Sequence, residues 1–175
     1  LLQEPENRTR YRARIELSGR NTGDVIPAVA SWLASLDKND PEYDHHRLEA
    51  LWVHQHHNVV HEKLLHELLA CSDHRARAAA TRILCYWRDR VADPVGRLKD
   101  LAADPHPRVR LEAVRACSFL RDLLAVEAAL ECLKQPTDEY LDYTLAETMK
   151  QLKPYWKPAI ATGQPFSKDN PAGAE

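Results

Sequence analysis

Residues 104–116, DPHPRVRLEAVRA, decide the fold predicted for this chain of 175 residues. A turn dipeptide, Asp104-Pro105, opens the stretch, and apolar residues at helical spacing follow it on both sides of Arg110. The same frame recurs at steps of 33, 30 and 33 residues, with arginines at Arg14, Arg47, Arg77 and Arg110, and with Tyr143 one step of 33 further on. A period in this range indicates a repeat architecture.

A small residue stands three positions after most of these recurring residues. The positions are Leu17, Ala50, Ala80, Ala113 and Ala146. Small side chains let neighbouring helices approach closely, whereas bulky ones would force successive units apart. We therefore expect the recurring frame to mark the packed face of one helix in each unit.

Further helical segments lie between these helices, at residues 24–36, 59–70, 93–103 and 123–134. Each unit is therefore predicted to be a pair of antiparallel helices, A and B, with the recurring residue on helix B. The stretch before Arg14 is too short for its own helix A. We predict an all-α, right-handed superhelix of about four helical pairs plus an N-terminal half repeat, with a domain at 1–162 and a linker at 163–175.

The stretch Asp104-Pro105, followed by Val109-Arg110 and Ala113, resembles the HEAT repeats, particularly their short variety. In that family the arginine of helix B bonds to aspartates at the turns between helices and forms a ladder along the stack. The resemblance implies a structural role in such a ladder for Arg14, Arg47, Arg77 and Arg110. A guanidinium suits this role because its fork of donors can satisfy several oxygens at once.

A wider resemblance covers most of the chain. The segments ALWVHQHHNVV (50–60), RAAATRILCYWRDRV (77–91) and PTDEYLDYTLAETMKQLKPYW (136–156) look like the helical region of Planctomycete-type membrane-bound dehydrogenases. In those bacterial proteins a β-propeller precedes the helical region and a c-type cytochrome domain follows it. The resemblance implies a spacer or docking module inside an exported or membrane-associated redox protein, with neighbouring domains or another protein as partners.

Composition argues against several other classes of protein. The 24 basic and 26 acidic residues leave a formal net charge of -2, so no net basic field attracts nucleic acid. No apolar run approaches the roughly 20 residues that span a bilayer, and we expect no membrane contact by this segment. The four cysteines, Cys71, Cys85, Cys117 and Cys132, show no Cys-x-x-Cys spacing, and buried free thiols are the interpretation we favour over disulfides.

Catalysis has no support in the sequence. No Gly-x-Ser-x-Gly motif occurs, and five glycines are too few to favour a phosphate-binding loop. We predict that the chain is not itself an enzyme, has no catalytic residue, needs no cofactor to fold and is a monomer.

Histidines gather in the stretch LWVHQHHNVVHEKLLH (51–66). On one continuous helix His54, His57 and His61 would share a face and could bind a metal. Asn58, however, stands where a helix end is expected, so the three should straddle a turn and diverge. We predict solvated or packed histidines and no metal site, with a histidine-rich metal-binding module as an open alternative.

The exposed face of the B helices carries the predicted partner-binding residues. They are Trp52, His56, Arg82, Tyr86, Arg115 and Phe119, at positions that should point away from the core. Aromatic and arginine side chains are favoured as interface anchors. Two alternatives stay open: the aromatic rings pack between repeats, or the arginines bind nucleic acid on a basic concave face. Glu49 and Glu112, expected on the same face, argue against nucleic acid.

Overall fold

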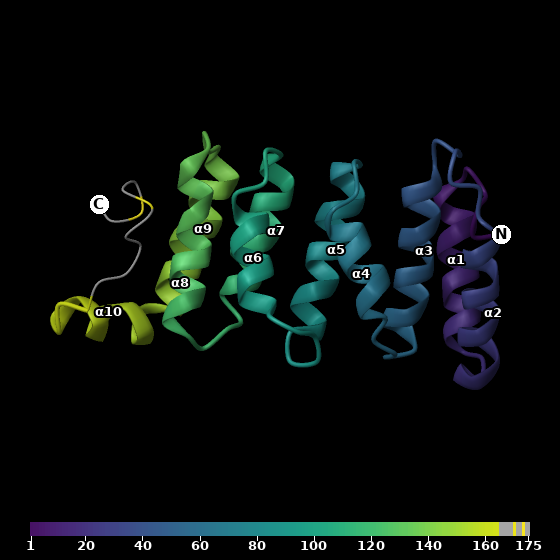
Figure 1. The fold of residues 1–175 in the computed structure, drawn as a ribbon, viewed down its shortest axis with the longest axis horizontal. Coiled ribbons are helices and arrows are strands. Elements are labelled where there is room, and N and C mark those ends of the chain that lie inside the picture. The colour runs from purple at the N-terminus through teal and green to yellow at the C-terminus, as the bar shows by residue number, and fades with distance from the viewer. Residues whose placement is uncertain (165–169, 171–172, 174–175) are drawn as a thin grey trace. The chain divides into compact units, whose positions relative to one another are not determined.

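The computed structural model describes residues 1–164, 170 and 173, and these residues are helical or lie in turns, without a strand. Figure 1 shows the helices in chain order. Their bounds are α1 Asn7–Ser18, α2 Thr22–Ser35, α3 Tyr43–His56, α4 Glu62–Leu69, α5 His74–Trp87, α6 Pro94–Ala102, α7 Pro107–Cys117, α8 Leu123–Leu130, the 3-10 helix η1 Glu131–Lys134, α9 Glu139–Gln151 and α10 Lys153–Ala161.

The helices follow the predicted order of A and B. The pairs are α2 with α3, α4 with α5, α6 with α7, and α8 with α9, while α1 is the half repeat and α10 follows the last pair. The all-α helical-repeat fold is thereby confirmed. Within each pair the connection is short, as antiparallel neighbours require.

The chain divides into two compact units, Leu1–Ala80 and Thr81–Glu175, and each is described by itself. In the first unit α3 packs against α1, α2 and α4. In the second unit α6 packs against α7 and α8, α7 packs against α9, and α10 contacts α8 and α9. The division falls within α5, whose first residues belong to the first unit and whose last residues belong to the second.

Apolar side chains from the facing helices form the core of each unit. In the first unit the buried side chains include Val25, Val29, Leu48, Ala50, Leu51, Val53, Leu64, Leu65 and Leu68. In the second they include Ile83, Leu84, Trp87, Leu98, Val109, Ala113, Val114, Val126, Leu130 and Leu141. The predicted small positions Ala50, Ala80 and Ala113 are fully buried, which lets the B helices pack closely.

Local capping explains where several helices begin. Asp93 accepts a hydrogen bond from the Gly96 amide at 3.0 Å, and Asp138 accepts one from the Leu141 amide at 2.8 Å. Each satisfies an amide that the first helical turn leaves without a partner. At α7 the capping residue is His106, whose Nδ1 accepts from the Arg108 amide at 3.2 Å.

Helix α3 ends as the sequence predicts. Asn58 adopts a left-handed conformation with φ of 55°. The Val59 amide donates to the His54 carbonyl at 3.0 Å, and the Asn58 amide donates to the Gln55 carbonyl at 3.0 Å. This pair of bonds satisfies the last carbonyls of the helix, and asparagine tolerates the left-handed backbone that the turn needs.

Asn170, in the predicted linker, contacts the end of α8. Asn170 is 2% exposed, and its side-chain amide donates to the Leu130 carbonyl at 2.7 Å in the second unit. Most of residues 163–175 lie outside the described residues, and the boundary at 162 stays a prediction.

Candidate functional site

Arg110 of α7 joins two turns of the second unit. Arg110 is 2% exposed, and its Nη1 donates to the carbonyls of Asp104 at 2.9 Å and Pro105 at 3.0 Å. Its Nη2 donates to the carbonyl of Pro136, at the turn before the next B helix, at 2.6 Å. One guanidinium thus supplies donors to two successive repeats, which is a structural role.

Arg77 makes the same contact in the first unit. Its Nη1 donates to the carbonyls of Cys71 and Ser72, both at 2.9 Å, and these stand six and five residues earlier as in α7. In α3, Arg47 instead bonds carboxylates, with 3.2 Å from Nη1 to Oδ1 of Asp44 and a short contact to Glu67.

In α1 the equivalent residue is Arg10, and the frame that placed Arg14 there is wrong by one helical turn. Arg10 donates through Nη1 to the carbonyls of Glu4 at 2.5 Å and Pro5 at 2.8 Å, again six and five residues earlier. Three residues later stands Ala13, which is buried. The sequence carries this signal as a Glu-Pro turn followed by Arg-x-x-Ala, whereas the spacing of 33 residues points to Arg14.

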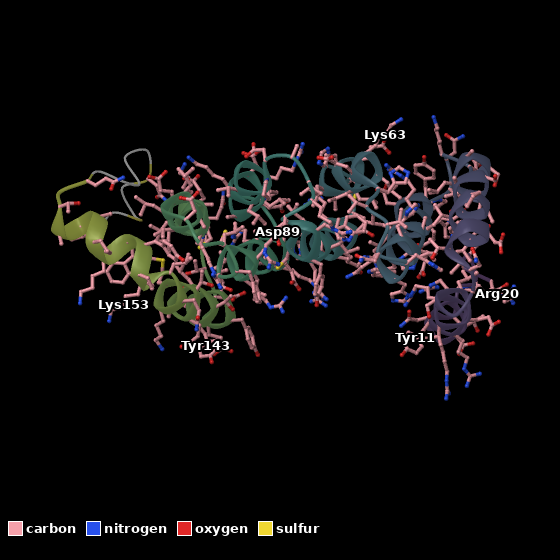
Figure 2. The ribbon with its side chains drawn as sticks, turned by 90° about the horizontal axis from the view of Figure 1, so that it is seen from below. Tyr11, Arg20, Lys63, Asp89, Tyr143 and Lys153 are labelled. Carbon is pink, nitrogen blue, oxygen red and sulfur yellow. The ribbon has the colours of Figure 1, made fainter. Side chains whose placement is uncertain are left out.

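The frame is also wrong in α9. Tyr143 is 69% exposed, and Figure 2 shows it projecting from α9. Ala146 is exposed as well, whereas Leu141 and Thr148 are buried, and the Thr148 hydroxyl donates to the Val114 carbonyl at 3.2 Å. A phenol cannot replace the guanidinium that binds turn carbonyls, and the helix turns its Leu141 face to α7 instead.

A buried carboxylate lies beneath the exposed face of α5 and α7. Glu112 was predicted on the exposed face, but it is buried, with 5% of its surface exposed. Arg82 bonds it through two nitrogens, with 3.2 Å from Nε to Oε2, and Arg115 Nη1 lies 3.7 Å from Oε2. This pairing raises the pKa of Arg82, chiefly through the hydrogen bond from its guanidinium to Glu112. The two guanidinium groups offset the cost of burying the carboxylate.

The first unit repeats this arrangement. Glu49 is fully buried and meets Arg10 at 3.1 Å, Arg14 at a short distance and His45 at 3.3 Å. Burial acts to raise the pKa of Glu49, but the hydrogen bonds from His45 and Arg14 outweigh it and hold the pKa below its ordinary value. Glu49 and Glu112 each stand two residues after a recurring arginine, so both belong to the repeat and neither is on the exposed face.

The second unit exposes the rings of Tyr86 and Phe119, besides those of Tyr140 and Tyr143 on α9. Tyr86 is 59% exposed and Phe119 is 49% exposed. Arg88 and Arg115 lie over the Phe119 ring, at 5.7 and 5.8 Å from its centroid. We call the face formed by Arg82, Tyr86, Arg88, Arg115 and Phe119 the α5/α7 surface. Its side chains are available to a partner, and Glu112 holds Arg82 and Arg115 in place.

The predicted residues of the first unit are partly covered. Trp52 is half-buried, with the Arg14 guanidinium 4.6 Å from its ring centroid and the His45 ring edge-on at 6.3 Å. His56 is exposed at the end of α3. Trp52 therefore packs against its own unit to a greater extent than Tyr86 or Phe119.

The three histidines straddle the turn at Asn58, as predicted, but two of them meet instead of diverging. The rings of His54 and His61 meet edge to face, with centroids 4.8 Å apart, because the turn at Asn58 reverses the chain. His57 points elsewhere, with its Nε2 donating to the Leu17 carbonyl at 3.0 Å and its Nδ1 accepting from Thr22 at 3.0 Å. Nothing in the described part of the chain brings three metal-ligating side chains together.

His54 is the most perturbed of the described histidines. It is 3% exposed, and neither ring nitrogen has a hydrogen-bond partner of ordinary geometry within the described residues. Burial lowers its pKa to about 4, the nearby His61 adds to the shift, and the Val59 backbone opposes it in part. The ring is therefore neutral at physiological pH.

The four cysteines are free thiols. Burial raises the pKa of Cys132 to about 11 and that of Cys117 further, and burial together with Asp44 raises the pKa of Cys71 to about 11. Thiols with raised pKa values are poor nucleophiles and poor metal ligands at neutral pH.

A cavity of about 610 Å³ lies beside the α5/α7 surface, within the second unit. Its lining includes Arg88, Asp89, Phe119, Arg121, Gln151 and Tyr155. Asp89, labelled in Figure 2, lies just beyond the end of α5. Sequence reasoning missed this cavity, because its walls come from the turns after α5 and α7, and from α9 and α10.

These features define a helical-repeat protein in which arginines join successive turns. The chain belongs to the HEAT repeats, whose family matches residues 62–150, which is 89 of the 175 residues. That span runs from α4 to α9. HEAT repeats are generally non-catalytic and often mediate protein interactions. No curated protein and no solved structure matched the chain. Within the described residues, no helix is long and apolar enough to cross a membrane.

Proposed function

We propose that this chain is a non-catalytic scaffold that docks a partner protein through the α5/α7 surface. The observation that carries this proposal is the exposure of Tyr86 and Phe119 on one face, beside arginines that are themselves half exposed. Large aromatic rings left in water are unfavourable for an isolated domain, and they are the side chains that contribute most at interfaces. Glu112 supports the same role because it orients Arg82 and Arg115 without occupying the surface.

A second, smaller contact is proposed for the first unit, through Trp52 and His56. The Trp52 ring is only half covered, and Arg14 and His45 hold its orientation. We propose that this patch contributes less than the α5/α7 surface, since its aromatic area is already partly buried.

The partner proposed is a neighbouring domain of a larger, exported or membrane-associated redox protein, and the chain itself acts as a monomer. The support is the resemblance of residues 50–60, 77–91 and 136–156 to the helical region of Planctomycete-type membrane-bound dehydrogenases. The full-length sequence tests this directly. An upstream β-propeller or a downstream Cys-x-x-Cys-His motif supports the proposal, and a full-length sequence with neither contradicts it.

Photo-crosslinking tests the docking surface itself. The full-length protein is prepared with p-benzoylphenylalanine in place of Tyr86, and separately in place of Tyr140, which is 68% exposed on α9 and serves as the control. We expect the Tyr86 position to give one defined adduct, mapped by mass spectrometry to a neighbouring domain or a single partner, and the Tyr140 position to give none. Equal labelling from both positions would show that the α5/α7 surface has no special role.

A further inference from the structure

We propose that the cavity beside the α5/α7 surface receives an acidic side chain, Asp or Glu, of the docked partner. The proposal rests on the proposed docking function and names the chemistry of what docks. A cavity of about 610 Å³ lies in the size range of sites that hold a small group, and its lining supplies charge, polar groups and an aromatic wall.

Arg121 provides an uncommitted positive charge at this cavity. Its side chain is exposed and makes no ion pair or hydrogen bond with any of the described residues. A guanidinium presents a planar fork of donors that matches the two oxygens of a carboxylate. Arg121 can therefore bind a carboxylate without first breaking a contact of its own.

Arg88 provides a second guanidinium that is held in place but not saturated. Its Nη1 donates to the Cys85 carbonyl at 2.8 Å, and its guanidinium lies over the Phe119 ring. Its Nη2 is 3.7 Å from Oδ2 of Asp89, whose side chain is 80% exposed, so this ion pair is weak. A partner carboxylate entering the cavity can compete with Asp89 for the same nitrogen.

The other lining residues of the cavity can contact the methylene groups of an acidic side chain. Phe119 is 49% exposed and offers an apolar surface to the methylene groups, while Gln151 and Tyr155 add polar groups to the lining. Arg82 and Arg115 extend the positive charge along the α5/α7 surface beyond the cavity. The whole region carries four arginines against Glu112 and Asp89, which leaves two positive charges unbalanced.

The observations favour an acidic protein segment over nucleic acid. A nucleic-acid strand is bound through a series of phosphate contacts along a groove. Here two of the four guanidinium groups are turned to the buried Glu112, and the chain as a whole has a net charge of -2. A single cavity with two available arginines fits one carboxylate better than a run of phosphates.

Calorimetric titration of the 175-residue chain with a short blocked peptide of alternating Glu and Phe tests the inference. We expect a dissociation constant on the order of 100 µM, and at least roughly ten-fold weaker binding of the same peptide with Gln in place of Glu. Arg121→Glu should abolish measurable binding. Arg108→Glu, an exposed arginine at the start of α7 that does not line the cavity, is the matched control and should change binding less than about two-fold.

A variant that binds the peptide more tightly gives a further test, because a misfolded protein would bind it more weakly. Asp89→Asn removes the carboxylate that competes for Arg88 and should tighten binding by roughly two- to five-fold. Equal weakening by Arg121→Glu and Arg108→Glu, or no binding of the acidic peptide, would overturn the proposal. Oligothymidylate that binds as tightly as the peptide and is displaced by it would overturn it in favour of phosphate recognition. If the peptide fails but Tyr86 still crosslinks, the docking function stands and only the acidic chemistry is lost.

Discussion

Protonation of His54 should destabilise the first unit in mild acid. The folded-state pKa is about 4, below the ordinary value of 6.5, because the ring is buried. The unfolded chain therefore binds the proton at a higher pH than the folded chain does. Stability is fully present above pH 6.5, begins to fall as the pH drops below that value, and stops falling from this cause below pH 4.

The size of the effect follows from the same two pKa values. A pKa difference of about 2.5 corresponds to about 3 kcal/mol over the whole window. Between about pH 7.5 and pH 4.5 the residue should account for about 2–3 kcal/mol of lost unfolding free energy. Glu49 and Asp73 have pKa values held below their ordinary ones, so their contributions are lost mainly at lower pH and do not obscure this window.

Urea unfolding at about pH 7.5 and pH 4.5, followed by circular dichroism and by tryptophan fluorescence, measures the effect. His54→Leu removes the buried imidazole and should reduce the pH-dependent loss by about 2–3 kcal/mol. It should change stability little at neutral pH, because the lost nitrogens had no partner of ordinary geometry. Burial also lowers the pKa of His56, which adds to the loss in both proteins, so their difference isolates His54. If His54→Leu loses as much stability in acid as the wild type, the reasoning is wrong.

Two further predictions concern the turns between helices. Arg110→Ala should lower the unfolding free energy by about 3 kcal/mol, because the carbonyls of Asp104, Pro105 and Pro136 lose their donor. The control Arg108→Ala, at an exposed position of the same helix, should change it by less than about 0.5 kcal/mol. Denaturant titration of both variants decides this, and equal effects would contradict a structural role for Arg110. Asn58→Val should cost about 1–2 kcal/mol because a β-branched residue resists the left-handed backbone, whereas Asn58→Gly should stay within about 0.5 kcal/mol of wild type. Thermal unfolding compares the two, and tolerance of valine would show that the turn relaxes.

Local sequence patterns predicted where several helices begin and end, because capping bonds join residues only a few positions apart. The start of α6 at Asp93-Pro94 and the end of α3 at Asn58 depend on bonds between residues only a few positions apart. The buried Ala50, Ala80 and Ala113 followed from a period that α3, α5 and α7 keep, although α1 and α9 depart from it. These features are written in short stretches of sequence, so no neighbouring helix is needed to find them.

Prediction failed where the rotation of a helix about its axis decides the outcome. Arg14 and Arg10 stand one turn apart, and only the position of the Glu4-Pro5 turn shows which of them binds turn carbonyls. Helical spacing predicted an exposed Glu112, yet it is buried and paired with Arg82 of the preceding B helix. His54 and His61 meet because the chain reverses at Asn58, which a helical wheel cannot represent.

The sequence by itself determined the repeat, the helices, several of their caps and the buried alanines of three B helices, because periodicity and capping act within a few residues. Only the tertiary structure decided the site. It buried Glu112 beneath Arg82 and Arg115, left Tyr86 and Phe119 in solvent, and joined Arg88 and Arg121 around one cavity. The physical reason is that charge pairing and exposure depend on which side chains arrive from other helices, at distances that sequence spacing does not specify.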